Sequence, residues 1–574
     1  MTEPTATPVV AQWVLCHGCR HLIFGHRMRR ALDVCPRCGH HHPVSAPERV
    51  AQLADPGSVD PLPFTVSDTD PLEFVAVAPY TESIAQAQAR TGLPEAVVCA
   101  RATIEGQPVV IAAMDVRFLG GTMGTAVGEL MTLAAEAAVD ERRELVVVTS
   151  SGGARVQEGA LALMQMAKTA AAVDEVSRSG LLTVAVVADP TFGSVAASFA
   201  GLADIVFAEP AARLGYTGRG VASRPTGAGA PPDPQTAEVL LPRGLLDGIV
   251  TRPQLRPRLG RLLRIGGSKI CGQGSAGTRL PVLTVTEPDQ LPKVDPWRQV
   301  GRARTLSRPT ALDYLERAFT DFQELHGDRI GGDCPAVVAG VAWLGRVPTI
   351  VVAVQKGHTD AELVTRNFGM VSPAGYRKAA RLMRLADRLG LPVVTLVDTP
   401  GAHPGREAEA HGQVAAIGES LRCMASLSVP VVSVIIGEGG NGGALALALA
   451  NRVLMFSGST YSVVSPESCA SILWKDEAAA PAAARALRLD APDLLRLGVV
   501  DAVIPEPPGG VGAASLDATA RLRAVLSHEL HALSRQSPEA LRACRRARFR
   551  RFGAAVTADA ELLDINRQLG TGRP

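Results

Sequence analysis

Four cysteines near the amino terminus have the spacing of a metal site. Cys16 and Cys19 form one C-x2-C pair, and Cys35 and Cys38 form a second pair after 15 intervening residues. Each pair can direct two thiolates at one point, and two pairs complete a tetrahedron around Zn²⁺ with no position left for a substrate. We therefore predict a structural zinc ribbon, with a redox dithiol as the alternative. The three histidines at 40–42 are predicted to form a solvated turn, and an alternative ligand among them is the second interpretation.

A second chemical candidate contains no reactive side chain. The segment GEGGNGGALALALANRV, residues 437–453, follows a β-branched run and leads into Ala and Leu, without Ser, Cys, His or Lys. The first N–H groups of a helix have no partner inside the helix, and glycine lets a ligand approach them closely. Such a backbone can bind a phosphate, or an oxygen that becomes negative during a reaction.

Two nucleotide-binding interpretations of these glycines fit poorly. Gly437, Gly439 and Gly442 satisfy G-x-G-x-x-G, but the dinucleotide fingerprint also requires an acidic residue about 20 positions on. The sequence there is FSGST, and the next acidic residue is Glu467. A P-loop requires Gly-Lys-Ser or Gly-Lys-Thr, and this segment has Gly-Gly-Ala.

An oxyanion hole explains why such turns occur in pairs. Gly152 and Gly153 accompany Gly193 and Ser194, whereas Gly401 accompanies Gly442 and Gly443. Two holes predict two reactants that each carry a carbonyl group. Tight packing of a helix on a strand, which can require glycine for steric reasons, is the alternative explanation.

The elements that must position these turns recur along the chain. From about residue 100, a short β-branched run ends in a glycine-rich turn and continues into an Ala/Leu-rich helical pattern, and a shift of roughly 248 residues superposes a second copy on the first. Alternating strands and helices predict two similar α/β domains with mostly parallel sheets. Residues 215–235 and 266–281 are predicted to be irregular, and the basic stretch 541–553 is predicted to be a solvated helix face.

Bulk composition excludes several classes of protein. The 574 residues are 47% hydrophobic and 20% charged, with a net charge of +2, which is not the profile of a polyanion binder. Neither a signal peptide nor a membrane span is expected. Ten scattered or metal-spaced cysteines indicate a reducing compartment, so we expect a cytoplasmic protein.

Several long blocks resemble a known enzyme family. WVLCHGCR, FLGGTMGTAVGE, SGGARVQEGALALMQMAKT and DPTFGSVAASFA resemble the β subunit of the bacterial acetyl-CoA carboxylase carboxyltransferase. RNFGMVSPAGYRKAARLM, DTPGAHPG, IGEGGNGGALAL and STYSVVSPESCASILW resemble its α subunit. The resemblance implies two crotonase-like (ClpP/crotonase) α/β domains after a small zinc ribbon with four cysteine ligands. The expected boundaries are 12–45 for the ribbon, 46–280 for the β-type domain, 281–300 for a linker and 301–555 for the α-type domain.

The resemblance also implies a reaction. A carboxyl group passes from carboxybiotin, on a separate biotin carboxyl carrier protein loaded by a biotin carboxylase, to acetyl-CoA, which gives malonyl-CoA for fatty acid synthesis. The biotin supplies the base, so the protein need only align two reactants and stabilise two oxygens. Removing one oxyanion donor costs about 3–4 kcal/mol of barrier.

By analogy with the family, specific residues receive roles. The acyl-CoA thioester is expected at Gly193 and Ser194, and biotin at Gly442 and Gly443. Gly152, Gly153 and Gly401 are expected to contribute to the same two binding sites. Arg366 is expected to recognise a carboxylate, and Lys356 to meet the CoA phosphates or the biotin site; a structural arginine is the alternative for Arg366. The active site is expected between the first half of one protomer and the second half of its partner in a homodimer or higher oligomer.

Departures from the family pattern keep other functions open. Gly193-Ser194 stands where the β family has Gly-Gly, and the stretch after Gly215 is rich in Pro and Gly instead of charged and helical. Propionyl-CoA, another acyl-CoA, or malonyl-CoA supply to a polyketide pathway are alternatives within the class. A crotonase-like hydratase or hydrolase would use a carboxylate such as Glu158 or Asp189. A non-catalytic scaffold, or a zinc-ribbon nucleic-acid binder with its basic Arg27, Arg29 and Arg30 beside Phe24, is the third class.

Overall fold

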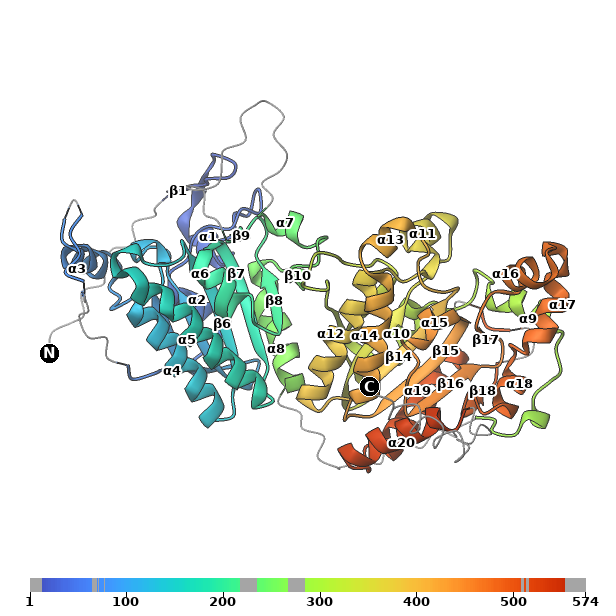
Figure 1. Ribbon diagram of the computed structural model, residues 1–574. Helices are drawn as coiled ribbons and strands as arrows, with labels where there is room; N and C mark the ends of the chain where they lie inside the picture. Colours follow the sequence, from blue (N-terminus) through green and yellow to red (C-terminus); the bar gives the residue numbers. More distant parts are fainter. Residues whose placement is uncertain are drawn as a thin grey trace, which may run out of the picture.

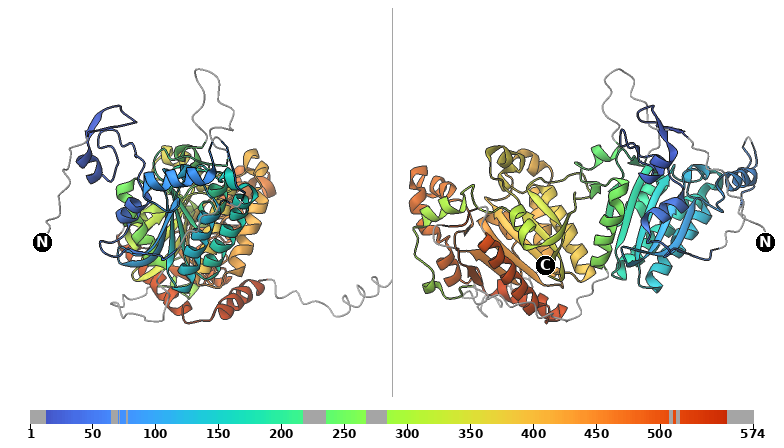
Figure 2. Two further views of the ribbon diagram at one scale, coloured as in Figure 1. Left: turned by 90° about the vertical axis from the view of Figure 1, so that its left-hand side faces the viewer. Right: turned by 180° about the vertical axis from the view of Figure 1, so that it is seen from behind.

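The computed structural model describes residues 13–64, 70, 72–76, 78–216, 235–266, 284–506, 510–512 and 516–552. Figure 1 shows two α/β halves side by side, with a small cysteine-rich ribbon on the first half. Figure 2 shows this ribbon projecting from the body of the first half. The irregular segments predicted at 215–235 and 266–281 lie largely outside the described residues. None of the described helices is long and apolar enough to cross a membrane.

An eight-stranded sheet organises the first half, in the order β10-β8-β7-β6-β5-β4-β3 with β9 added on β7. The strands from β5 to β10 pair in parallel, and β3 and β4 are antiparallel at one edge. The bounds are β3 Asp60–Pro61, β4 Val97–Ile104, β5 Gln107–Met114, β6 Glu144–Ser151, β7 Thr183–Phe192, β8 Ile205–Ala208, β9 Leu214–Gly215 and β10 Gly248–Ile249.

Helices cover both faces of this sheet because its parallel strands are apolar on both faces. Val109 and Ile111 of β5 belong to the core under α2 (Ala46–Leu53) and α8 (Arg252–Gly266). Val110 and Ala112, one residue out of phase, belong to the core under α4 (Thr125–Asp140) and α5 (Gly159–Arg178). The alternation of strand side chains thus divides this half into two cores.

The second half repeats this arrangement in the order β11-β12-β13-β14-β15-β16-β18, with β17 added on β15. Its strands are β11 Thr320–Glu324, β12 Val337–Leu344, β13 Val347–Val354, β14 Val393–Thr399, β15 Val431–Gly440, β16 Arg452–Phe456, β17 Thr460–Ser462 and β18 Ala502–Ile504. Side chains of α12 (Pro373–Leu389) and α14 (Gln413–Ser426) join one core. Those of α10 (Ala311–Ala318) and α19 (Leu516–Leu533) join the other.

Shorter elements connect or cap these layers. The ribbon contains β1 Trp13–Leu15, β2 Leu22–Phe24 and α1 Gly25–Arg30. The others are α3 Tyr80–Thr91, α6 Gly193–Val195, α7 Ala237–Leu240, α9 Pro296–Ala303, α11 Asp360–Thr365, α13 Arg406–Ala410, α15 Asn441–Leu445, α16 Pro466–Cys469, α17 Ala480–Leu487, α18 Ala491–Arg496 and α20 Pro538–Arg550.

The internal duplication is confirmed down to local irregularities. The pairing of β6 with β7 shifts register between Thr149 and Ser151, and that of β14 with β15 shifts between Val397 and Thr399. These positions differ by 248, as do the isolated parallel bridges Met123–Ala154 and Val371–Ala402. A shared irregularity at one offset indicates that both copies position the following turn in the same way.

Charged contacts join the two halves along the β10 edge. Asp247 is fully buried there, and it accepts Arg381 Nη2 at 2.8 Å and also pairs with Arg329. Arg388 of α12 pairs with Asp204 in the same way. Gly244 and Gly327, both with positive φ, approach so closely that a Cβ on either would collide with the backbone of the other half.

The prediction of a solvated basic helix face at residues 541–553 is wrong for one face of α20, whereas Arg546 and Arg550 are exposed as predicted. Arg545 is 1% exposed, and it donates to the carbonyls of Met424, Leu427 and Val429 and to Asn451 Oδ1. Arg548 is also buried and pairs with a carboxylate of the second half. This face of the helix is buried because the Arg545 guanidinium satisfies the carbonyls at the end of α14.

Candidate active site and metal centre

The four ribbon cysteines come together as their spacing predicts. Their sulfur atoms all lie within 4.8 Å of one another, with Cys16 Sγ 3.6 Å from Cys38 Sγ and Cys19 Sγ 4.0 Å from Cys35 Sγ. Sulfur ligands bound at about 2.3 Å in a tetrahedron are about 3.8 Å apart. The cluster can therefore hold a metal ion with four thiolate ligands.

The histidines beside this cluster are packed, not solvated, so that prediction is wrong. His42 is buried, and His41 Nδ1 lies 3.4 Å from Glu209 of the first half. Arg49 and Arg252 pair with the same carboxylate at 2.7 and 2.8 Å. Burial of Glu209 opposes its ionisation, but His41 and the two arginines outweigh burial and hold its pKa below the usual value. These contacts attach the ribbon to the first half.

In the first half, the Gly152-Gly153 pair packs against the Gly193-Ser194 pair, and together they form one compact turn. Gly153 has φ +113° and Gly193 has φ +56°, and a Cβ on Gly193 would lie 3.3 Å from Gly153 Cα. Gly153 N donates to Ser151 Oγ, and Gly152 N donates to Gly120 O at 2.9 Å. Gly193 and Ser194 begin α6, so their N–H groups have no partner inside that helix.

A matching turn stands at the same place in the second half. Gly401 packs on Asn441, the first residue of α15, so closely that a Cβ on Gly401 would collide with the Asn441 side chain. The space beside Gly442 is open, because a Cβ there would meet nothing within 4 Å. At Gly443 the Cβ would lie 2.6 Å from Tyr376 Oη and against Ala402 N. Gly442 is therefore the accessible glycine of this turn.

Asn441 is a residue that sequence reasoning left out of the site. It has φ +49°, and its Oδ1 accepts Gly443 N at 2.7 Å and Ala402 N at 3.3 Å. The offset of 248 relates Gly193 to Asn441 and Ser194 to Gly442, and both first residues have positive φ. The amide of Gly443, proposed from sequence as a donor to substrate, is thus used by Asn441. The repeat offset was the signal that could have identified Asn441.

Comparison with known proteins agrees with this duplicated geometry. Residues 284–553 match the protein family described as "Acetyl co-enzyme A carboxylase carboxyltransferase-like". Residues 68–237 match the family described as "Carboxyl transferase domain". The β/α carboxyl transferase of Parafrankia sp. strain EAN1pec is 52% identical over 594 aligned positions, which cover 100% of this chain and 97% of the relative. The chain belongs to the acetyl-coenzyme A carboxylase carboxyl transferase family. It is a carboxyl transferase with its β-type and α-type parts fused in that order.

One further relative matches a part of this carboxyl transferase in sequence, and a solved structure shares its fold. The α subunit of the Thermus thermophilus enzyme is 54% identical over 259 residues, or 45% of this chain and 82% of that subunit. A solved structure of the transcarboxylase 12S core, with methylmalonyl-coenzyme A and methylmalonic acid bound, aligns with a TM-score of 0.66 at 21% identity. It covers 89% of this chain and 92% of that one, and supports the crotonase-like fold.

Lys356 of the carboxyl transferase lies behind the second turn, paired with carboxylates. Its Nζ is 2.8 Å from Asp398 and 2.7 Å from Glu438, and Glu438 is also 2.7 Å from Arg304. Burial alone would lower the pKa of Lys356, but the two carboxylates outweigh burial and raise it. These four side chains line a cavity of about 260 Å³ that also reaches Pro400. The ammonium therefore lies beside the turn, with its charge balanced.

Arg366 stands at the margin of this region. It follows α11, and its Nη1 donates to Pro335 O at 2.9 Å. The next turn brings Gly369 against the Lys356 side chain and Asp398 O. Its role in carboxylate recognition stays a prediction.

The carboxylates of the hydratase alternative are engaged elsewhere. Glu158 is 1% exposed, and it accepts Tyr80 Oη at 2.6 Å and Thr125 N at 2.5 Å. Asp189 pairs with Arg213 at 2.6 Å. Both carboxylates are therefore engaged by neighbouring side chains of the first half.

The two turns of one chain do not share a site. Figure 1 places α6 in the first half and α15 in the second, well apart. Two reactants bound at these turns in a single chain could not exchange a group.

Proposed function

We propose that this carboxyl transferase moves the carboxyl group of carboxybiotin, on a separate carrier protein, to acetyl-CoA and so produces malonyl-CoA. Two strand-end turns related by the duplication, each followed by a short helix whose first N–H groups have no backbone partner inside that helix, carry this proposal. A group transfer between two carbonyl compounds needs one such site for each reactant.

The chain's own residues would contribute alignment and backbone hydrogen bonds. The amides of Gly193 and Ser194 would stabilise the thioester oxygen as negative charge develops there, with Gly153 shaping the turn. Asn441 and Gly442 would do the same for the ureido oxygen of biotin, with Gly401 and Gly443 packed behind them. The biotin ring would supply the base, which fits the engagement of Glu158 elsewhere.

Lys356 and Arg366 would act on the biotin side. Two carboxylates balance the Lys356 ammonium. The pocket wall would therefore present charged groups without the excess positive charge that attracts a polyanion. Arg366, with only a backbone acceptor in the described structure, would meet the carboxyl group that is transferred. The ribbon would bind Zn²⁺, because four thiolates in a closed tetrahedron are typical of a structural zinc site.

A complete site would require a second copy of the chain. The separation of α6 from α15 is the reason, since the first half of one protomer must face the second half of its partner. We therefore propose a symmetric homo-oligomer with two equivalent sites per pair. A biotin carboxylase would use ATP and load the carrier, and all these proteins would act in the cytoplasm.

The test is the reverse reaction of the purified full-length protein. Malonyl-CoA and biocytin are supplied, and the appearance of acetyl-CoA is followed. Turnover that requires biocytin, and exceeds turnover with methylmalonyl-CoA, supports the proposal. Faster turnover of methylmalonyl-CoA would assign another acyl-CoA, and turnover independent of biocytin would contradict the biotin-dependent mechanism.

A further inference from the structure

One amide of the first-half turn has no acceptor. Ala154 is half-buried and follows Gly153, and its N–H meets no acceptor among the described residues. The groups on either side are used, since Gly153 O accepts Met123 N at 2.8 Å and Arg155 N donates to Met123 O at 2.9 Å. The carbonyl and N–H groups of one trans peptide point in opposite directions. The Ala154 N–H therefore points away from Met123.

The duplicated position in the second half shows where this N–H points. Ala402 corresponds to Ala154, and its N–H donates at 3.3 Å to Oδ1 of Asn441, the first residue of α15. Asn441 corresponds to Gly193, and both residues have positive φ. Because Gly193 has no side chain to accept the amide, the Ala154 N–H faces the start of α6, where Gly193 and Ser194 lie.

The two turns are held in place by different side chains. In the second half, Asn441 Oδ1 accepts Gly443 N as well, at 2.7 Å, and so ties the turn to α15. A glycine at position 193 cannot do this, so the first turn must be held by other groups. The residue that follows Ala154 is Arg155, whereas His403 stands at the corresponding place in the second half. The His403 ring accepts Gly405 N, within its own turn.

Arg155 is buried, and its guanidinium is fully hydrogen-bonded. The residue is 1% exposed, and Nη1 and Nη2 donate to the Glu95 carboxylate at 2.7 and 2.6 Å. Nη1 also donates to Tyr80 Oη at 3.1 Å, while Nη2 and Nε donate to Thr122 O and Oγ1 at 2.8 and 3.1 Å. These bonds use every N–H donor of the guanidinium. Burial alone would lower the pKa of Arg155, but Glu95 outweighs burial and raises it, so the group stays charged.

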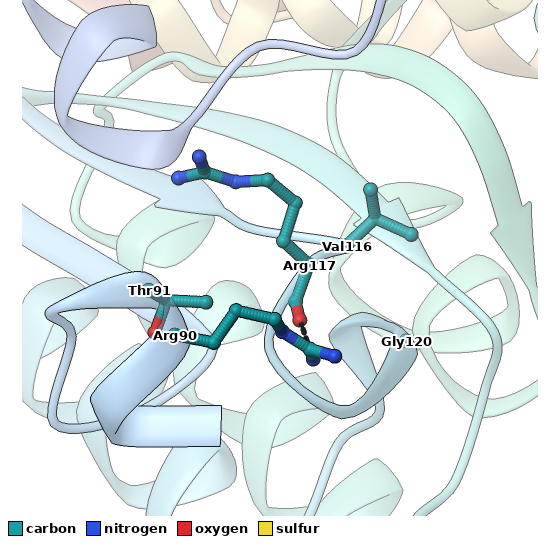
Figure 3. Close-up of a pocket in the computed structure, with 5 residues that line it drawn as sticks. All are labelled: Arg90, Thr91, Val116, Arg117 and Gly120. Atoms are coloured by element: carbon teal, nitrogen blue, oxygen red, sulfur yellow. Dashed lines mark hydrogen bonds between the residues drawn. The ribbon is translucent and has the colours of Figure 1, made fainter. Parts of the chain in front are cut away.

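Arg155 fastens the turn to the loop that follows β5. Figure 3 shows Gly120 in this loop, and Gly120 O accepts Gly152 N at 2.9 Å. Two residues further along, Thr122 accepts from the Arg155 guanidinium, and the next residue, Met123, bonds to the backbone on both sides of the open amide. A displacement of the guanidinium would therefore move this loop and tilt the peptide that carries the open N–H.

We propose that Arg155 is a positioning residue of the first-half site. Its buried ion pair with Glu95 holds the loop at Thr122, and through that loop it directs the Ala154 N–H at the thioester oxygen. This inference rests on the proposed function, and Arg155 itself does not touch the substrate. A backbone donor stabilises developing charge only where it is in place before the reaction, and a misplacement of about 1 Å can cost about 10²-fold in rate.

The test replaces the guanidinium by an ammonium group. Arg155→Lys keeps a positive charge beside Glu95, but one ammonium cannot reach the carboxylate, Tyr80 and both oxygens of Thr122 together. In the biocytin-dependent reverse reaction it should lower kcat about tenfold and leave KM for malonyl-CoA and for biocytin unchanged. Glu95→Asp, which keeps both charges but shortens the carboxylate side chain, should give the same result. An unchanged kcat, or a raised KM with kcat unchanged, would overturn the proposal.

Arg548→Lys is the matched control. Arg548 is also buried, and it pairs with the carboxylate of Asp501 and donates to Val499 O at 2.7 Å. Asp501 accepts Val453 N near the start of β16, whereas the second turn follows the ends of β14 and β15, so this pair lies away from both turns. Both lysine variants should lower the melting temperature, but Arg548→Lys should leave kcat per folded protein unchanged. An equal loss of kcat in both would assign the loss to destabilisation and contradict a positioning role.

A vibrational measurement separates this inference from the proposed reaction. Acetyl-CoA with an isotopic label at its thioester carbonyl carbon is bound to each protein, and the infrared difference spectrum gives the carbonyl stretching frequency without turnover. N–H donors at the oxygen lower this frequency, and the lowering should be smaller in Arg155→Lys than in the wild-type and Arg548→Lys proteins. That result supports the positioning role even where biocytin-dependent turnover is absent. Equal lowering in all three proteins, or no lowering in the wild-type protein, would refute the role, and biocytin-dependent turnover would then leave the reaction standing.

Discussion

Division of the active site between two protomers can be tested by mixing two inactive variants. Gly193→Ala places a methyl group 3.3 Å from Gly153 Cα and fixes a residue at φ +56°, at about 1–2 kcal/mol of backbone strain. Gly442→Val projects into open space, so it blocks the second turn without a clash inside the chain. Both variants should therefore fold.

The expected activities follow from the separation of the two turns. Each variant alone should lose about 10²-fold or more in turnover, because the donors of one turn are misplaced or covered in every site. In a mixed pair, one site receives both altered turns, and the other receives the wild-type first half of one chain and the wild-type second half of its partner. Such a pair should recover about half of the wild-type turnover, and an unsorted equal mixture about a quarter.

The assay uses two affinity tags. Both variants are expressed together, pairs that carry both tags are isolated, and biocytin-dependent decarboxylation of malonyl-CoA is measured. Pairs no more active than either parent would show that each chain completes its own site, which would refute the inference from the separation of α6 and α15. Two co-expressed wild-type chains with the same tags are the control.

Other predictions concern the second turn, buried charge and the metal. Gly442→Ala should leave the melting temperature unchanged, while Gly443→Ala, whose methyl would lie 2.6 Å from a tyrosine hydroxyl, should lower it by several degrees; equal melting temperatures would contradict the packing described. Arg545→Met should destabilise the protein by about 3–5 kcal/mol because buried acceptors lose their donor, and an unchanged denaturation midpoint would contradict this. Burial raises the pKa of Glu144 to about 7, against the opposing hydrogen bond from the Leu182 amide. Because the folded form then binds the extra proton, this carboxyl should cost stability progressively from about pH 4.5 to pH 7, by about 3 kcal/mol in all, and Glu144→Gln should remove that part of the pH dependence of unfolding. A strong chelator should release one Zn²⁺ per chain and loosen the ribbon, detected as faster proteolysis there, while the melting of the two sheets stays the same.

Much of the fold was readable from short segments of sequence. The C-x2-C pairs specify their own local turns, so the meeting of Cys16, Cys19, Cys35 and Cys38 followed from spacing. The shift of 248 residues revealed the duplication, because strand, turn and helix patterns depend mainly on neighbours along the chain. The same offset relates Asn441 and Gly442 to Gly193 and Ser194, although Asn441 was not predicted as a site residue.

Pairings between distant residues were beyond such reasoning. His41 and Arg545 look polar and exposed in the sequence, but Glu209 lies against His41, and the carbonyls after α14 accept from Arg545. A guanidinium or imidazole becomes a core group wherever the fold supplies enough acceptors. Sequence spacing carries no information about acceptors that lie 100 or more residues away.

The sequence by itself determined the family, the metal-binding pattern and the two glycine turns, because each is written in residues close together along the chain. Only the tertiary structure decided which amides stay open, that Asn441 occupies Gly443, that Asp398 and Glu438 balance Lys356, and that the two turns lie apart. These outcomes depend on hydrogen-bond and charge partners brought together by packing, and such partners are set by the arrangement of whole sheets.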